Sequence, residues 1–340
     1  MDPPTNTPLP SMATSPLSAP PPGSTTPADP TFRHYTAAQA SSYLGGRPGY
    51  PDALIETILT HHLSTGGQLT TLLDVGCGPG TATRSFAPYF TRAFGVDPSV
   101  AMIDAARARH STTDTGTADD DVVPATPIHF AISTAEDLPG AELASALPPG
   151  SVDLLTAATA AHWFDMARFW PRASSLVRPG GTVALWTGAS FYCHPHTTPN
   201  AKAVQRVLDR LERERLWPYK TRGNELGNGL YRELGMPWEG GVLDGGFPEA
   251  EFVRKEWNVG GEVEVGERFF VGHEVASLED FAKVCATSSM VTRWREAHPD
   301  LVGTEDDVVI LTVRELQEAL GGQEGFEGGT ATGLLLFKRR

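Results

Sequence analysis

Short apolar segments alternate with helix-compatible segments through the first half of the chain. The apolar runs are rich in Leu, Val, Phe and Ala and have the length of buried strands: 71–74, 92–97, 127–132, 151–157 and 182–187. The segments between them show helix boundary residues or helical spacing: 81–90, 99–109 and 166–177. Buried strands that alternate with helices of ordinary length predict a parallel, doubly wound α/β sheet.

This alternation ends after residue 188. Further elements are expected beyond it: helices at 199–216, from Ser277, at 289–297 and from Thr304 to Leu320, and strands at 251–259, 266–273 and 334–338. Because 189–300 is too long for a simple crossover connection, we expect part of it to form a cap over the substrate.

Composition sets the remaining boundaries. Residues 1–30 are mostly Pro, Ser and Thr and are expected to be disordered, because they can bury too little apolar surface to offset the entropy of ordering. An N-terminal segment at 31–70 contains a helix near 52–62 and precedes the core at 71–188. After the cap, residues 301–340 are expected to form the last helix and the final strand of the core.

Net charge and cysteine content limit the partners and the cellular compartment that we expect for this protein. The 340 residues carry 27 basic and 41 acidic side chains, a net charge of -14, which argues against nucleic acid or an anionic membrane as the main partner. Three isolated cysteines favour a reducing compartment over a disulfide framework. No apolar run reaches the length of about 18 residues that a membrane helix needs, so we expect a cytoplasmic protein that acts on a small molecule.

The segment around Asp74 gives the strongest indication of a ligand-binding site. Gly76, Gly78 and Gly80 follow the first strand, and a helix is expected to begin at Thr81. Glycines in a strand–turn–helix unit let backbone N–H groups approach a ligand. A dinucleotide fold requires G-x-G-x-x-G, whose third glycine is replaced here by Thr81, which argues against an NAD-dependent oxidoreductase. Asp97 ends the second strand, where a carboxylate can accept both hydroxyls of an adenosine ribose.

The acid followed by G-x-G-x-G resembles the first motif of Rossmann-like methyltransferases that use S-adenosylmethionine (SAM). Four further stretches resemble fungal class I methyltransferases of the trans-aconitate and cantharidin methyltransferase type: 47–51, 135–139, 161–165 and 178–181. The resemblance covers roughly 33–338. It implies a seven-stranded, mostly parallel sheet with an antiparallel last strand, a cap insertion, SAM as cofactor, and methylation of small molecules, several of them carboxylic acids.

The resemblance also implies site residues. The expected cofactor contacts are Asp74, Gly76, Cys77, Gly78, Gly80, Thr81, Asp97, Pro98, Met102, Ala135, Glu136 and Ala157. His162 and Trp163 follow the fourth strand and are expected at the catalytic and substrate site. Segments before the first strand often close over the cofactor in such enzymes, so Tyr43, Arg47 and Tyr50 are candidate lid and substrate contacts, although Gly46 replaces the Tyr that often precedes Arg-Pro.

The resemblance favours O-methylation of a carboxylate by in-line methyl transfer, and a phenol or alcohol is the alternative acceptor. A carboxylate is ionised at pH 7 and needs no general base, but it favours a cation, for which Arg47, Lys220 and Arg222 are candidates. A phenol or alcohol needs a base, and His162 is the candidate. His162 can equally be a structural histidine. A non-catalytic regulator with this fold is a further alternative, against which the presence of Asp74 and Asp97 argues. The pair His194 and His196 lacks a second pair of ligands, so no metal is expected.

Overall fold

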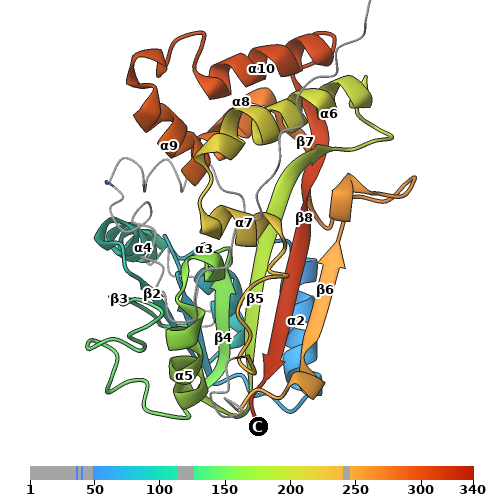
Figure 1. The fold of residues 1–340 in the computed structure, drawn as a ribbon. Helices are drawn as coiled ribbons and strands as arrows, with labels where there is room; N and C mark the ends of the chain where they lie inside the picture. Colours follow the sequence, from blue (N-terminus) through green and yellow to red (C-terminus); the bar gives the residue numbers. More distant parts are fainter. Residues whose placement is uncertain (1–35, 37–39, 41–48, 114–125, 240–245) are drawn as a thin grey trace, which may run out of the picture.

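The computed structural model describes residues 36, 40, 49–113, 126–239 and 246–340 (Figure 1). Within these residues the strands form one sheet with the order β3-β2-β1-β4-β5-β8-β6, and β7 pairs with the remaining part of β8. The strands are β1 (Thr71–Val75), β2 (Arg92–Asp97), β3 (Ile128–Ile132), β4 (Val152–Ala158), β5 (Val177–Cys193), β6 (Val253–Trp257), β7 (Val271–Ser277) and β8 (Gly325–Lys338).

Strands β1 to β5 pair in parallel, whereas β8 is antiparallel to β5, β6 and β7. The described α-helices are α2 (Asp52–Ser64), α3 (Thr81–Phe86), α4 (Val100–Thr113), α5 (Met166–Leu176), α6 (Ala201–Arg210), α7 (Arg222–Asn228), α8 (Leu278–Ala286), α9 (Ser289–Ala297) and α10 (Val308–Ala319). The expected mostly parallel sheet with an antiparallel last strand is confirmed, but the described sheet has eight strands instead of seven because β7 adds to β8.

Helices cover both faces of the sheet, which explains why its central strands are apolar throughout. On one face, α2 and α3 pack against alternate strand residues such as Leu72 and Leu154. On the other face, α5 packs against their neighbours Leu73 and Leu155. This alternation follows from the period of two in a strand. Asp165 is the N-cap of α5, and its side chain accepts a hydrogen bond from the Arg168 amide.

Helices α6, α8, α9 and α10 form a separate layer above the sheet (Figure 1). They share their own apolar cluster, which includes Val204, Phe281, Trp294 and Leu316. The helix α10 therefore packs in the cap, whereas the sequence placed 301–320 with the core. After α10 the chain returns to the sheet as β8. This strand pairs with β5 along most of its length, with β7 through its first half and with β6 through its second half.

Several boundaries differ from the sequence-based expectation. The strand β5 begins at Val177 instead of residue 182 and runs on to Cys193 instead of residue 187. The strand β8 begins at Gly325 instead of residue 334 because its glycine-rich first half is held by pairing on both sides. The short helix α7 was not expected; Thr221 and Asn224 form a capping box at its start.

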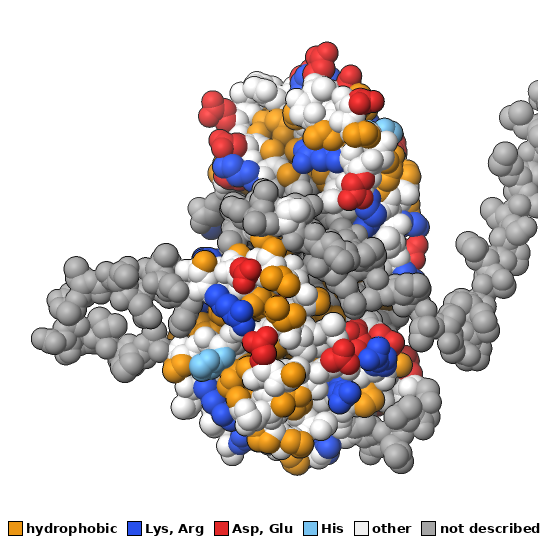
Figure 2. Space-filling model, turned by 90° about the vertical axis from the view of Figure 1, so that its left-hand side faces the viewer, with side chains coloured by type: hydrophobic (Ala, Val, Ile, Leu, Met, Phe, Trp, Pro, Cys, Tyr) orange, Lys and Arg blue, Asp and Glu red, His pale blue; other side chains and the backbone are white. Residues whose placement is uncertain are grey.

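The surface of the described residues is mixed in charge. Figure 2 shows Lys and Arg side chains interspersed with Asp and Glu over the cap and the sheet region, with no continuous basic patch on the visible described part of this face. Among the described helices, none has both the length and the apolar character needed to cross a bilayer.

Candidate functional site

A single cavity of about 940 Å³ runs from the carboxyl ends of β1, β2 and β4 into the space beneath the cap. Its lower half is lined by the glycine turn after β1 and by segments after β2, β3 and β4. Its upper half is lined by β5, β7 and β8 together with helices of the cap. A crevice at the carboxyl ends of the strands is where open α/β sheets bind ligands.

The three glycines of the turn have different roles. All three have positive φ angles of 66°, 54° and 81°, which glycine adopts without strain. A Cβ on Gly76 would lie 2.6 Å from Ala160 Cβ, and one on Gly80 would lie 2.6 Å from Phe130, so both sites require close packing. A Cβ on Gly78 would meet no atom within 4 Å. Because Gly78 lines the cavity and Gly80 does not, Gly78 leaves the open space that a ligand can fill.

Asp74 supports the turn from beneath. Its side chain is fully buried and accepts hydrogen bonds from the Thr83 hydroxyl at 2.7 Å and the Thr156 hydroxyl at 2.8 Å. Burial raises the pKa of Asp74 to about 6. Asp74 does not line the cavity, although the sequence placed it among the cofactor contacts. It joins β1, α3 and β4, and thus holds the turn in position.

Asp97 lies at the cavity wall. Its Oδ2 accepts from the Gly78 amide at 3.0 Å and its Oδ1 accepts from the Ser99 amide at 2.8 Å. Each carboxylate oxygen has a further lone pair, so the group can still accept from two ligand hydroxyls. Burial raises the pKa of Asp97 to about 6.

The remaining residues expected to contact the cofactor also separate into those that line the cavity and those that do not. Those that line the cavity are Cys77, Thr81, Pro98, Met102, Ala135 and Glu136. Glu136 is buried, and its Oε1 accepts from the Asp165 amide at 2.9 Å, which ties the segment after β3 to the start of α5. Ala157 is fully buried within β4 and does not line the cavity; its neighbour Ala158 does.

His162 and Trp163 both line the cavity, after β4. His162 Nδ1 lies 2.9 Å from the Tyr231 hydroxyl, and Trp163 packs against Gly223 of α7. Tyr231 is fully buried, and its burial raises the pKa of its hydroxyl, so the hydroxyl stays protonated at neutral pH. The sequence did not identify Tyr231 as part of the site.

Of the lid and cation candidates that the structure describes, Tyr50 alone lines the cavity. Tyr50 lines the cavity and packs edge-on against Trp186, whereas Tyr43 and Arg47 lie outside the described residues. Lys220 and Arg222 do not line the cavity. Both bind Glu225, and Arg222 also binds Glu233, so these two expected substrate cations are engaged elsewhere. Among the described cavity-lining residues there is no Lys or Arg.

The upper half of the cavity contains polar groups that sequence reasoning missed. Glu212 lines it, and its Oε1 accepts from the Ser190 hydroxyl and from the Asn228 amide group, each at 2.9 Å. Glu212 lies in the charged run 211–216, which suggests a solvated helix face. The only sequence signal that part of this run is buried is the leucine at each end, Leu211 and Leu216.

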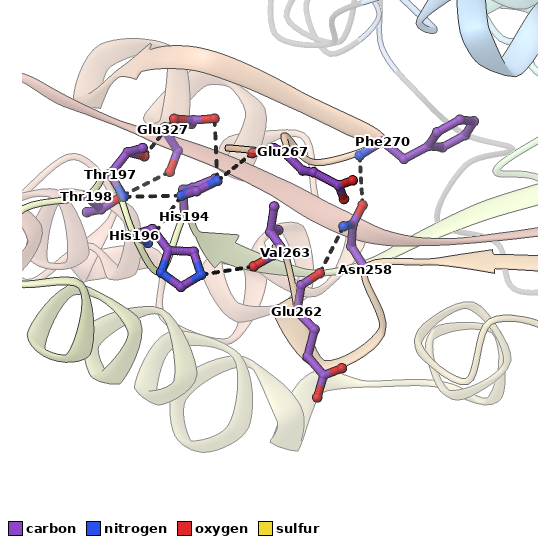
Figure 3. A network of polar contacts seen from close by, with 10 residues as sticks. All are labelled: His194, His196, Thr197, Thr198, Asn258, Glu262, Val263, Glu267, Phe270 and Glu327. Atoms are coloured by element: carbon purple, nitrogen blue, oxygen red, sulfur yellow. Dashed lines mark hydrogen bonds and ion pairs between the residues drawn. The ribbon is translucent and has the colours of Figure 1, made fainter. Parts of the chain in front are cut away.

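The two histidines at 194 and 196 have structural roles (Figure 3). His194 Nδ1 accepts from the amides of His196 and Thr197, so its Nε2 carries the proton and donates to the Glu267 carbonyl at 2.9 Å. His196 Nε2 donates to the Val263 carbonyl. These bonds fasten the segment after β5 to 263–267. The described residues contain no group of three or more side chains arranged to hold a metal ion.

Comparison with known proteins agrees with this geometry. Residues 73–185 match a family model described as a methyltransferase domain. The chain is similar to the Saccharomyces cerevisiae protein named "Probable S-adenosylmethionine-dependent methyltransferase CRG1", with 27% identity over 293 residues that cover 82% of this chain and 87% of that protein. It is also similar to methyltransferase cfoB of Aspergillus candidus, with 29% identity over 322 residues covering 87% and 93% of the two chains.

Among solved structures, a protein described as "a Putative Type II Methyltransferase from Anaeromyxobacter dehalogenans" superimposes with a TM-score of 0.56 at 26% identity, over 86% of this chain and 97% of that one. The matched domain includes the glycine turn, Asp97 and His162. The fold, the matched domain and these relatives establish that the chain is a methyltransferase that uses SAM.

Proposed function

We propose that this SAM-dependent methyltransferase methylates a hydroxyl group, phenolic or alcoholic, of a small molecule bound in the upper half of the cavity. The observation that supports this is the single cavity in which the glycine turn and Asp97 share one space with His162 and the cap. At about 940 Å³ it lies at the upper end of the range for ligand pockets, roughly 300–1,000 Å³, and can accommodate a cofactor and a small acceptor together.

SAM, when bound, supplies an electrophilic methyl group on a sulfonium. In this proposal Gly76, Cys77 and Gly78 present the backbone to the cofactor, and Asp97 binds its ribose. Pro98, Met102, Ala135 and Glu136 surround the adenine. Asp74 acts through the turn as a positioning residue, because it does not reach the cavity.

The choice of a hydroxyl depends on His162. If its Nδ1–H donates to Tyr231 Oη, its Nε2 keeps a lone pair and can accept the proton of the acceptor hydroxyl. The chain must also hold the acceptor oxygen in line with the methyl group, about 3–3.5 Å away. Trp163, which packs between His162 and α7, forms a wall that restricts the orientation of the acceptor.

A carboxylate acceptor, which the trans-aconitate resemblance favours, is the competing proposal. It lacks support from the described cavity lining, where Glu212 and Asp280 are on the substrate side and no Lys or Arg is present. Arg47, outside the described residues, is the remaining candidate cation.

The test is incubation of the full chain with methyl-labelled SAM and matched panels of small phenols, alcohols and carboxylic acids. We expect labelled methyl ethers, which survive mild alkali. Label released by mild alkali indicates methyl esters and would favour the carboxylate. His162→Ala should lower the turnover of phenols about 100-fold or more, while SAM binding is retained. An ether-forming enzyme unaffected by His162→Ala would show that His162 is not the base.

A further inference from the structure

Glu212 is held by one oxygen and leaves the other open. Its Oε1 accepts two hydrogen bonds, from the Ser190 hydroxyl and the Asn228 side chain, which fix the orientation of the carboxylate. Among the described residues, none donates a hydrogen bond to Oε2. Since Glu212 lines the cavity, this second oxygen is available to a ligand there.

Three separate segments meet at this carboxylate, and the backbone of each has an uncommon conformation. Ser190 has a φ of 53° at an irregularity in the pairing of β5 with β8. Glu212 lies in a π-helix, Leu211–Leu216. Asn228 ends α7, and is followed by Leu230 and Tyr231 with φ angles of 52° and 62°. Left-handed non-glycine residues, irregular strand pairing and π-helices each cost stability and concentrate at functional sites.

This group lies close to the proposed reaction site. Asn228 follows Gly227, and a Cβ on Gly227 would lie 3.6 Å from both His162 Nδ1 and Thr187 Oγ1. The helix α7 thus connects the Glu212 carboxylate to the His162–Tyr231 pair. A substrate that reaches His162 with its acceptor hydroxyl can contact Glu212 with a second group.

The charges that line the upper half of the cavity indicate whether the substrate group that contacts Glu212 is cationic, neutral or anionic. No Lys or Arg among the described residues lines the cavity, and burial raises the pKa of Glu212, with the Ser190 hydroxyl and the exposed Arg213 opposing this effect. A partly buried carboxylate with an open oxygen is stabilised by a hydrogen-bond donor, most strongly by a cationic one, and disfavours a second anion.

We infer that Glu212 is a specificity-determining residue that binds a hydrogen-bond donor on the substrate, preferably a protonated amine, at the end opposite the acceptor hydroxyl. This inference rests on the proposed function and adds the substrate class: a small amino-phenol or amino-alcohol. Ser190 and Asn228 are positioning residues that hold the carboxylate.

The test measures binding, not turnover. The full chain is loaded with S-adenosylhomocysteine and titrated calorimetrically with three phenols that differ mainly in the charge at the end of a short arm: tyramine, 4-propylphenol and 3-(4-hydroxyphenyl)propionate. We expect tyramine to bind about tenfold or more tightly than the propionate, with 4-propylphenol between them. Absence of tyramine binding, or tighter binding of the propionate, would overturn the inference.

The variant Glu212→Gln keeps an oxygen for Ser190 and Asn228 but replaces the open Oε2 with an uncharged N–H donor. It should weaken tyramine binding about tenfold and strengthen binding of the propionate. Glu214→Gln, an exposed position on the same π-helix, should leave all three affinities unchanged. An unchanged tyramine-to-propionate ratio in Glu212→Gln would also overturn the inference.

Two measurements separate the possible failures. Thermal unfolding and S-adenosylhomocysteine affinity of Glu212→Gln should match the wild type, which excludes a folding defect as the cause of weaker binding. Because the preference is measured by binding, tyramine binding without formation of a methyl ether would contradict the proposed hydroxyl methylation, while the role of Glu212 would stand.

Discussion

The Asp97 carboxylate accepts a hydrogen bond from the Gly78 amide at 3.0 Å, which joins the end of β2 to the glycine turn after β1. The contact links the two sequence signals that first indicated an adenosine-type ligand. It also fixes Asp97 at the cavity wall, with lone pairs left for ribose hydroxyls. The turn and the acid therefore form one preorganised unit.

Cofactor binding should be coupled to proton release at Asp97. Burial raises the pKa of Asp97 to about 6 in the unliganded chain. Ribose hydroxyls and a cationic cofactor favour the ionised carboxylate, so binding requires deprotonation below this pKa. The affinity for SAM should then fall by about tenfold per pH unit below pH 6 and level off above it.

This coupling can be measured by calorimetric titration between pH 5 and 8 in buffers of different ionisation enthalpy. Proton release should be detected near pH 5.5 in the wild type and be lost in Asp97→Asn. An identical pH profile for Asp97→Asn would assign the titration to another group.

Alanine at two glycines of the turn should have different consequences. Gly76→Ala combines a positive φ with a contact 2.6 Å from Ala160 Cβ, and should lower the free energy of unfolding by about 2–3 kcal/mol. Gly78→Ala has the positive φ alone, at a cost of about 1–2 kcal/mol, and should mainly weaken SAM binding.

Chemical denaturation and SAM titration of both variants test this distinction. Gly66→Ala, with a φ of 88° and no neighbour within 4 Å, is the matched control for backbone strain alone. Equal loss of SAM affinity in Gly66→Ala and Gly78→Ala would contradict a specific role for Gly78.

Tyr231→Phe should impair catalysis without changing the affinity for the cofactor. The variant removes the hydroxyl that lies 2.9 Å from His162 Nδ1 and keeps the buried ring. Loss of this partner frees the imidazole to adopt the other tautomer, and kcat for a phenol acceptor should fall about tenfold. SAM affinity should remain that of the wild type, and an unchanged kcat would exclude Tyr231 as a positioning residue.

His194 should contribute to stability through its backbone contacts and not through a metal. His194→Ala leaves the His196 and Thr197 amides and the Glu267 carbonyl without their partner, and should cost about 2–4 kcal/mol. His196→Ala, at an exposed position, should cost less than about 1 kcal/mol. A fall in the unfolding temperature on addition of a chelator would contradict this assignment.

The sheet core was predictable because its signals are local. The segments around Asp74 and Asp97 place strand, turn and helix within a few residues of each other, and the structure has them where the sequence predicts. In contrast, β8 extends over fourteen residues although 328–333 is rich in Gly, Thr and Ala. Its conformation there depends on pairing with strands far away in sequence, which no local pattern contains.

The upper half of the site could not be predicted for a similar reason. Glu212 resembles its exposed neighbours in a charged helix, and its contacts with Ser190 and Asn228 join segments that are far apart in sequence. Tyr231 is separated from His162 by 69 residues. Lys220 and Arg222 were expected to bind the substrate as cations, and their ion pairs with Glu225 become evident only in three dimensions.

The central claim is that the glycine turn and Asp97 bind the nucleoside part of SAM. The most direct measurement is calorimetric titration of the full chain and of Asp97→Ala with S-adenosylhomocysteine, with Asp104→Ala, an exposed acid on α4, as the control. We expect one site per chain, a loss of about 10- to 100-fold for Asp97→Ala, and no change for Asp104→Ala. A wild-type chain that does not bind this ligand, or equal affinity in Asp97→Ala, would contradict the claim.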